Sequence, residues 1–331
     1  MLIDPFGRPI TYLRISITDR CNLRCVYCMP DGAAGWIPSQ KVLSDDEIVR
    51  VASAAAGLGL TSIRLTGGEP LVRPGVVALV GRLAAIAGIK DISLTTNAIQ
   101  LARLAHPLAQ AGLRRVNISL DTLDRDKFRQ ITRLGNFDEV WQGILAAEQA
   151  GLRPLKLNTV VVGGFNDDEL PSLARLTIEH AWHVRFIELM PVGSSDTWPD
   201  GNLAPTPHRY YPIQQIHQKL CDLDLEPTVV PSGNGPARSY RIPGALGTVG
   251  FISPLGEHFC EKCNRLRLTA DGRLRSCLLK AGEVDLKPAL QSDAELEPLF
   301  QAAIQLKPIG HMLSGEAKQS SPNSAMSQIG G

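Results

Sequence analysis

The sequence predicts an α/β protein, with a partial, six-stranded (β/α)6 barrel of the TIM type followed by a smaller α+β domain. From residue 12 to about residue 190, short β-branched runs alternate with helical stretches. This alternation is typical of βαβ units and a parallel sheet. We find six strands rather than the eight of a closed barrel, which favours a partial barrel over a doubly wound sheet. The alternation stops after Met190, so we expect domains over 1–193 and 194–331.

The elements of the first domain follow from hydrophobic periodicity and helix-capping residues. Ser44 is an N-cap residue with Glu47 at the capping-box position, and together they predict the start of the first long helix. The strands are expected at 13–17, 62–66, 91–96, 115–120, 155–162 and 183–189. The helices are expected at 44–58, 74–87, 100–111, 124–131, 137–150 and 168–180.

The second domain is expected to contain short strands. They are predicted at 225–230, 238–242, 248–252, 265–269 and 273–277. The segment Ala270-Asp271-Gly272 predicts a hairpin turn between the last two strands.

The two faces of the predicted barrel strands differ in polarity. Period-two alternation points one apolar face at the helices and a polar face into the barrel. Barrels of this type usually fill the interior with apolar side chains, and buried polar groups need partners, so we expect a large polar ligand there. Three cations favour a polyphosphate or a carboxylate, unless the register is shifted by one residue and this face is solvated. The polar positions are Arg14, Ser16, Arg64, Thr66, Ser93, Thr95, Asn117, Ser119, Lys156 and Asn158.

Three thiols lie directly after the first predicted strand. A helix could not aim the thiols of Cys21, Cys25 and Cys28, the first cysteine set, at one point. Their spacing therefore indicates a loop around a metal. Soft thiolates select zinc, cuprous copper or iron–sulfur clusters. Three ligands suit a cubane cluster with one open iron, whereas a zinc site would have to borrow a histidine. Simple redox thiols are the remaining alternative.

A second group of thiols lies in the predicted C-terminal domain. Cys260, Cys263 and Cys277 form the second cysteine set, which could bind a second cluster or, with His258, a structural zinc. Arg265 and Arg267 lie on one strand face beside it, either as a clamp for a polar substrate or as a solvated face. Cys221 has no partner pattern, and we expect a buried structural thiol.

Composition limits the classes of function. The chain has 331 residues, 44% of them apolar and 20% charged, with a net charge of +1. This balance gives no reason to expect a nucleic acid or a membrane as partner. The first residues have no secretory pattern, and no apolar run is long enough to span a bilayer. Six of the seven cysteines fall in metal-like groups, so we expect a cytoplasmic protein.

The first cysteine set, with Tyr27 directly before its last member, resembles the radical S-adenosylmethionine (SAM) superfamily. The segments Thr66-Gly67-Gly68-Glu69-Pro70 and Thr95-Thr96-Asn97, each at the end of a predicted strand, extend the resemblance. It implies a [4Fe–4S] cluster whose open iron binds SAM. One electron from this cluster then cleaves SAM to a 5′-deoxyadenosyl radical.

A narrower resemblance covers the chain from Phe6 to its end. The segment 13–21, the second cysteine set with its two arginines, and the ending 327–331 are similar to the enzymes that cyclise GTP in molybdenum-cofactor (molybdopterin) biosynthesis. The resemblance implies a second [4Fe–4S] cluster that binds guanine, removal of the ribose 3′ hydrogen, and attack of that carbon on C8. It also implies a reductant such as flavodoxin or ferredoxin, and a cyclic pyranopterin monophosphate synthase that takes the product. A monomer or a homodimer is expected.

The resemblance assigns roles residue by residue. It implies SAM contacts at Tyr27, Gly68, Ser119 and Met190. It implies GTP contacts at Arg14, Arg64, Thr95, Lys156, Arg265, Leu266 and Arg267. Catalytic roles fall to Arg14, Arg265, Arg267, Gly330 and Gly331. The tail from 314 to 331 is polar enough to be disordered, but its Gly-Gly ending can thread a narrow channel.

Two rival functions remain at this point. One is another radical SAM enzyme with a single auxiliary cluster, such as a peptide-modifying enzyme. The other is a non-enzymatic zinc protein that binds nucleic acid through Arg265 and Arg267.

Overall fold

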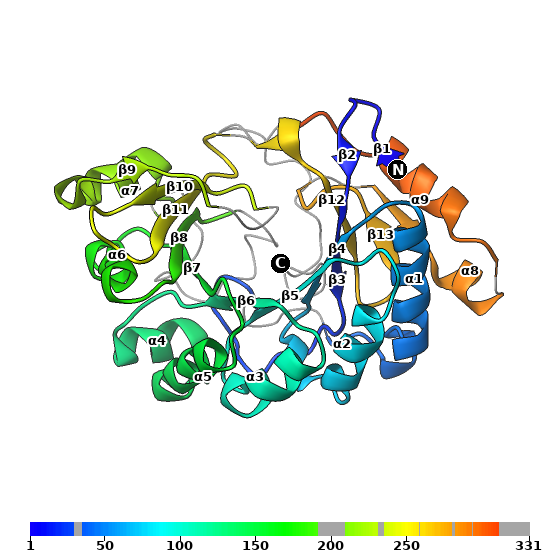
Figure 1. Cartoon of the computed structure of the whole chain (residues 1–331), viewed down its shortest axis with the longest axis horizontal. Helices are drawn as coiled ribbons and strands as arrows, with labels where there is room; N and C mark the ends of the chain where they lie inside the picture. Colours follow the sequence, from blue (N-terminus) through cyan, green and yellow to red (C-terminus); the bar gives the residue numbers. More distant parts are fainter. Residues whose placement is uncertain are drawn as a thin grey trace.

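A computed structural model describes residues 1–29, 35–190, 209–230, 235–257, 259–279, 282–292 and 294–310. Within these ranges the six predicted barrel strands are confirmed, and each pairs in parallel with the next. They curve into an arc, with helices on its outer side (Figure 1). The strands are β3 (Tyr12–Ser16), β4 (Ser62–Thr66), β5 (Asp91–Thr96), β6 (Arg115–Ser119), β7 (Lys156–Val161) and β8 (His183–Glu188).

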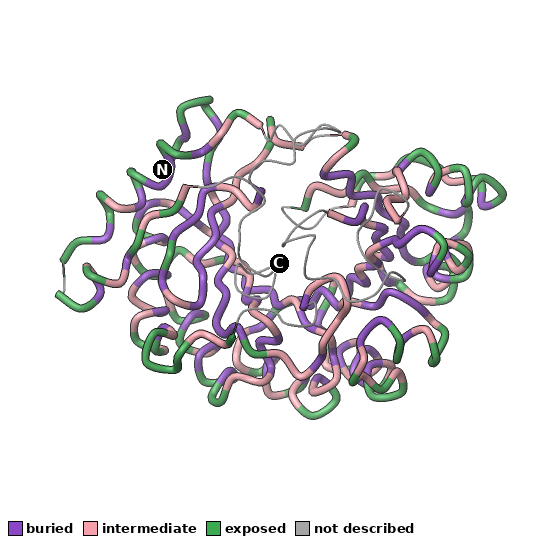
Figure 2. Tube along the Cα trace, turned by 180° about the vertical axis from the view of Figure 1, so that it is seen from behind, coloured by how far each residue is buried: buried purple, intermediate pink, exposed green. Residues whose placement is uncertain are grey.

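The helices between these strands form where the sequence predicts them. Ser44 and Glu47 make the expected capping box, with the Glu47 backbone N–H donating to Ser44 Oγ at 3.2 Å. The helices pack their apolar sides on the strands, and the buried positions follow the sheet in Figure 2. They are α1 (Asp45–Gly57), α2 (Val76–Ala84), α3 (Leu101–Gln110), α4 (Arg125–Thr132), α5 (Phe137–Gln149) and α6 (Leu170–Glu179).

The C-terminal half of the chain extends the same sheet at both edges. β12 (Arg265–Leu268) pairs in parallel with β3, and β11 (Thr248–Ile252) pairs in parallel with β8. β13 (Arg273–Arg275) and β14 (Glu283–Asp285) continue beyond β12, while β10 (Arg238–Arg241) and β9 (Glu226–Pro227) continue beyond β11. The predicted hairpin is confirmed, because β12 and β13 are antiparallel and Gly272 has a φ of +92°.

The remaining described elements cover the edges of this sheet. α7 (Ile213–Lys219) lies near β8, and α8 (Lys287–Gln291) and α9 (Glu297–Gln305) follow β14. A short hairpin of β1 (Leu2–Ile3) and β2 (Pro9–Ile10) contacts α9 through β1. The predicted boundary between residues 193 and 194 lies outside the described residues and stays a prediction. No helix in the described ranges is both long and apolar enough to cross a membrane.

The strand register confirms the predicted polarity of the two faces. In a sheet, side chains directly opposite each other on neighbouring strands point to the same side. Leu13 lies opposite Ile63, and Ile63 lies opposite Ile92, all three fully or almost fully buried under the helices. Arg14 lies opposite Arg64, one residue out of phase with these. The interior face is therefore the polar one.

One prediction about burial is wrong. Cys221 is exposed, and its sulfur donates to Asp222 Oδ1 at 3.5 Å. It begins a short 3-10 turn, Cys221–Leu223, after α7. Leu220 and Leu223 enter the core there and leave Cys221 on the outside.

Candidate active site

The two cysteine sets lie at opposite ends of the sheet. The first set follows β3, at the carboxyl ends of the parallel strands. Cys260 and Cys263 precede β12, which runs parallel to β3, and Cys277 follows the antiparallel β13. The second set therefore lies at the amino ends. A five-residue strand spans about 16 Å, and the interior face lies between the two sets.

The loop of the first cysteine set packs directly on the Gly-Gly loop after β4. The Gly68 backbone N–H donates to the Thr18 carbonyl at 2.7 Å, and the Glu69 N–H donates to the Arg20 carbonyl at 2.8 Å. A Cβ on Gly68 would collide with the carbonyl oxygens of Asp19 and Arg20. The glycines thus let this loop approach the backbone that leads into Cys21.

Glu69 connects the Gly-Gly loop to the loop after β5. Its buried carboxylate accepts hydrogen bonds from Leu71 N at 3.0 Å, Thr96 Oγ1 at 2.8 Å and Asn97 N at 2.7 Å. Burial raises the pKa of Glu69 to about 7 despite these three donors. Asn97 Nδ2 then donates to Asn22 Oδ1 at 2.8 Å, inside the first cysteine loop. Sequence reasoning did not single out Glu69 or Asn97 for this role.

Tyr27 is held by a buried carboxylate at the end of β6. Its hydroxyl donates to Asp121 Oδ2 at 2.8 Å, and Asp121 Oδ1 accepts from Val160 N at 2.9 Å. Burial raises the pKa of Asp121 to about 6 and also raises the pKa of Tyr27. Asp121 was not predicted, because a lone aspartate after a strand also fits an ordinary turn.

The cysteines of the first set are only partly exposed. Burial raises the pKa of Cys21 to about 11 and also raises that of Cys25. Both are thiols in the metal-free protein at neutral pH, and binding a metal group as thiolates would release protons.

The interior face carries more positive charge than the sequence predicted. Arg115 and Arg185 add to the three predicted cations, and the register places Arg267 beside Arg14. Asp91 pairs with Arg115, whose Nε donates to Asp91 Oδ1 at 3.0 Å. We call the following set the cationic face: Arg14, Arg64, Arg115, Lys156, Arg185, Arg265 and Arg267.

Burial and mutual repulsion lower the pKa values of several members of this face. Removal from water, and then the charges of neighbouring arginines, lower the pKa of Lys156 to about 6 and that of Arg185 to about 9. The same two causes lower the pKa of Arg267 to about 10. The buried Nε atoms of Arg185 and Arg265 and the Oγ1 of Thr95 find no hydrogen-bond partner among the described residues. A face with many buried cationic side chains and some unsatisfied donors fits a polyanion.

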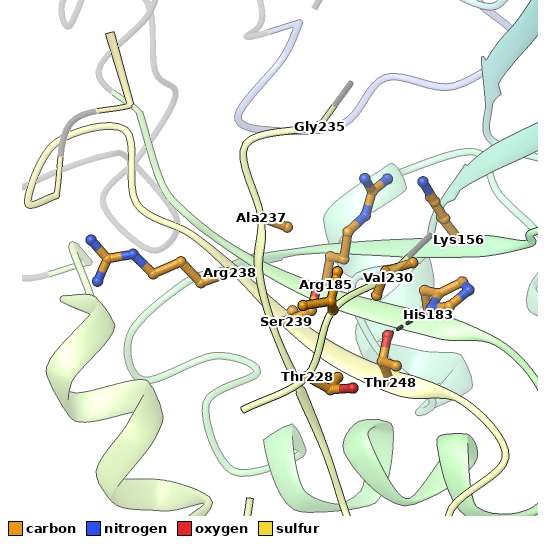
Figure 3. Close-up of a pocket in the computed structure, with 12 residues that line it drawn as sticks. Lys156, His183, Arg185, Thr228, Val230, Gly235, Ala237, Arg238, Ser239 and Thr248 are labelled. Carbon is orange, nitrogen blue, oxygen red and sulfur yellow. Dashed lines mark hydrogen bonds between the residues drawn. The ribbon is translucent and has the colours of Figure 1, made fainter. Parts of the chain in front are cut away.

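Lys156 and Arg185 extend in the same direction from the wall of a cavity of about 330 Å³ at the amino ends of β7, β8 and β11 (Figure 3). His183 lies beside them, with its Nδ1 2.6 Å from Thr248 Oγ1. Burial, and then the charge of Lys156, lower the pKa of His183 to about 4, so it is neutral at physiological pH. A second cavity of about 480 Å³ adjoins the second cysteine set and is lined by Phe259, Asn264 and Arg265.

The second cysteine set lies among cations. Burial raises the pKa of Cys263, but the nearby charges of Lys307 and Arg265 outweigh it and leave the pKa below its usual value. Such an environment suits a thiolate ligand. Within the described ranges, no three His, Cys, Asp or Glu side chains gather as the ligands of a single metal ion would. His258, the fourth ligand of the zinc alternative, lies outside the described residues.

The remaining predicted residues are placed as follows. Ser119 ends β6, and Met190 follows β8 and packs against Leu279. Leu266 is fully buried within β12, on the opposite face from Arg265 and Arg267, so only its backbone adjoins the interior. Gly330 and Gly331 lie outside the described residues.

Comparison with known proteins agrees with this arrangement. Residues 15–177 match the Radical SAM superfamily, and residues 182–313 match Molybdenum Cofactor Synthesis C. The fold is similar to that of Streptococcus suis SuiB bound to S-adenosylmethionine, with a TM-score of 0.61 and 15% identity over 90% of this chain and 68% of that one. The chain belongs to the class of radical SAM enzymes.

Two relatives identify the family within the radical SAM enzymes. A protein of Moorella thermoacetica named GTP 3′,8-cyclase is 52% identical over 99% of both chains. One of the same name from Heliobacterium modesticaldum is 49% identical over 100% of both. The chain belongs to the GTP 3′,8-cyclase family.

Proposed function

We propose that this enzyme cyclises GTP to (8S)-3′,8-cyclo-7,8-dihydroguanosine 5′-triphosphate, the first step of molybdenum-cofactor biosynthesis. The observation that carries the proposal is the cationic face, which lies between the two cysteine sets and gathers six arginines and a lysine, with Arg115, Lys156, Arg185 and Arg267 buried. A nucleoside triphosphate supplies negative charge to balance these cations, and it is long enough to reach from one part of this face to another. Family membership at about half identity over the full chain supports the same substrate.

The thiols of the two cysteine sets are the donor type that iron–sulfur clusters need. Cys21, Cys25 and Cys28 would hold one [4Fe–4S] cluster, and Cys260, Cys263 and Cys277 a second. SAM would contact Tyr27, Gly68, Ser119 and Met190, which lie at or beyond the carboxyl ends of the strands. When bound, the first cluster and SAM supply the radical that removes a hydrogen atom from the substrate.

The chain's own residues bind and orient the substrate. Arg14, Arg64 and Lys156 would hold the triphosphate, together with Arg185, through charge-assisted hydrogen bonds. Thr95 offers a buried hydroxyl with no protein partner among the described residues. Arg265, the Leu266 backbone and Arg267 would hold the nucleoside beside the second cysteine set. With the phosphates and the base both fixed, the ribose carbon keeps one position, and small displacements cost rate steeply.

Other parts of the proposal concern the cell. An electron donor such as flavodoxin or ferredoxin would reduce the first cluster, and a cyclic pyranopterin monophosphate synthase would consume the product. We expect the protein in the cytoplasm, as a monomer or homodimer.

Anaerobic protein with SAM, reductant and GTP provides the test. We expect 5′-deoxyadenosine and the cyclised nucleotide, identified by mass spectrometry and NMR. Cys21→Ala, Cys25→Ala and Cys28→Ala should each abolish 5′-deoxyadenosine while the iron of the second set remains. Cys263→Ala should abolish the cyclised nucleotide but allow some SAM cleavage. The exposed Cys221→Ala is the matched control and should change neither product. SAM cleavage without any modified GTP in the intact protein would contradict the proposal.

The ending of the chain is tested separately. Gly330→Ala, and a chain lacking residues 330 and 331, should bind GTP and cleave SAM but yield little cyclised product. A normal yield of cyclised product from both variants would contradict a role for the tail in the active site.

A further inference from the structure

Lys307 is a buried cation that contacts the second cysteine set. It lies just after α9, and only 4% of its surface is exposed. Its Nζ donates to the Arg265 carbonyl at 2.8 Å, to the Ser276 carbonyl at 3.0 Å and to Cys263 Sγ at 3.4 Å. An ammonium group has three N–H donors, and these three acceptors use all of them.

The three acceptors lie on the two segments that carry Cys263 and Cys277. Arg265 follows Cys263 at the start of β12, and Ser276 directly precedes Cys277. The ladder between β12 and β13 pairs Arg267 with Arg275 and Leu268 with Leu274, and stops before the cysteines. Lys307 therefore bridges the two segments beyond the last pair of the ladder, where no strand pairing holds them together.

A second buried cation fixes the segment that carries Lys307. Arg8 donates to the Cys260 carbonyl at 2.6 Å, to the Pro308 carbonyl at 2.6 Å and to the Ile309 carbonyl at 3.1 Å. Its own charge is paired with Asp4 at 2.5 Å. Residues 307–309 are thus tied to the turn that contains Cys260, and the position of the ammonium is set by contacts on both sides.

We propose that Lys307 is a positioning residue for the second cluster. It holds Cys263 and Cys277 in place, and its charge stabilises the reduced cluster. This inference rests on the proposed function, since it requires a cluster at the second cysteine set. Burying an ammonium is costly unless an anion lies beside it. Ligated thiolates supply that anion. Reduction adds a negative charge to the cluster, and both a nearby cation and hydrogen bonds to its sulfurs favour the reduced form.

The experiment isolates the second cluster. The parent protein carries Cys21→Ala, Cys25→Ala and Cys28→Ala, so that all iron belongs to the second set. Lys307→Gln keeps donors for the two carbonyls but removes the charge, and Lys307→Met removes both. Iron, zinc and sulfide per chain are measured, and the cluster is titrated with a reductant and followed by EPR. Thermal unfolding of the metal-free proteins checks that each variant folds.

We expect Lys307→Gln to retain its iron while its reduction equilibrium constant falls at least tenfold, which is about 59 mV for a one-electron couple. Lys307→Met should show the same fall and lose more than half of its iron. The matched control is Lys262→Gln, because Lys262 is exposed and adjacent to Cys263 in sequence. Water screens its charge, so its equilibrium constant should stay within threefold of the parent.

Each outcome decides the proposal. If iron content and the reduction equilibrium constant of both Lys307 variants stay within threefold of the parent, the role of Lys307 is overturned, while the proposed function is not. An equal fall in Lys262→Gln would also overturn that role, because any nearby charge would then act in the same way. A parent that holds zinc and no iron would overturn the two-cluster function, and this inference with it. If Lys307→Met does not fold, Lys307→Gln alone decides.

Discussion

Arg14 and Arg267 lie opposite each other in the parallel ladder between β3 and β12, with Arg64 opposite Arg14 on its other side. Two arginines from the two ends of the chain are thus neighbours on the interior face. Removal from water, and then the charge of Arg267, lower the pKa of Arg14. The protein maintains this repulsion in the absence of substrate, which indicates a face shaped for binding an anion rather than for stability.

The first prediction follows from this repulsion. Arg14→Met should raise the free energy of unfolding of the substrate-free protein by about 0.5–2 kcal/mol. The same change should weaken GTP binding by about 10- to 100-fold, the loss of a charge-assisted hydrogen bond of about 1.5–3 kcal/mol. Denaturant unfolding and calorimetric titration measure the two effects.

Two controls separate a phosphate role from a general one. Arg82→Met removes an arginine from the surface of α2, where it pairs with an exposed Asp46, and should change neither quantity appreciably. Guanosine binding should be much less sensitive to Arg14→Met than GTP binding. Equal losses for guanosine and GTP would show that Arg14 does not hold the phosphates.

The second prediction concerns proton uptake at Lys156. With its pKa lowered to about 6 by burial and then by Arg185, this lysine is mostly neutral at pH 8. A bound triphosphate favours the charged form, so GTP binding should take up close to one proton per chain. GTP affinity should accordingly fall as the pH rises from about 6, because binding then requires a proton that is scarcer in solution.

Calorimetry in buffers of different ionisation enthalpy measures this uptake. Lys156→Met should bind GTP more weakly and lose most of the proton uptake, whereas ionisation of the triphosphate itself remains in both proteins. The same uptake in wild type and variant would assign the protons to GTP and not to Lys156.

The third prediction tests the contact between the Gly-Gly loop and the first cysteine loop. In Gly68→Ala, the new Cβ would meet the carbonyl oxygens of Asp19 and Arg20, so the backbone before Cys21 must move. We expect a loss of about 1–3 kcal/mol in unfolding free energy and less iron on the first set. Gly57→Ala is the matched control, because Gly57 sits in the last turn of α1 and, apart from its chain neighbours and its own helix backbone, no atom lies within 4 Å of the new methyl. Retention of full iron and stability by Gly68→Ala would show that the loop accommodates the methyl group.

Local patterns predicted most of the fold, and contacts between distant segments account for the rest. The strand at 62–66 was predicted to the residue, because its apolar and polar positions alternate cleanly under a helix layer. The attachment of β11 and β12 to opposite edges of the barrel sheet was not predicted. Strands that pair with partners far away in sequence carry no local signal for that pairing, whereas the β12–β13 hairpin has its turn residues.

The site shows the same division. Arg115 begins β6 and lies on the same face as Asn117 and Ser119, so the period-two pattern that predicted the other interior residues could have included it. Arg185 was missed because β8 does not alternate cleanly. Lys307 had no sequence signal at all, since its role depends on acceptors brought together by the β12–β13 hairpin.

The last prediction concerns the pH dependence of stability that Glu69 causes. Burial raises its pKa from 4.5 in the unfolded chain to about 7 in the folded protein. The folded state therefore binds more protons than the unfolded state between these values, and the contribution of Glu69 to stability falls as the pH rises through this window.

Glu69→Gln removes the titration, and its amide can still accept hydrogen bonds from the loop after β5. The difference in unfolding free energy, wild type minus Glu69→Gln, should fall between pH 4.5 and 7 by at most about 1.4 kcal/mol per unit. Denaturant unfolding of the metal-free proteins at half-unit steps measures it, and taking the difference cancels the opposite trend from His183, whose pKa is lowered to about 4. A difference that stays constant across this window would mean that the three donors keep Glu69 ionised in the folded protein.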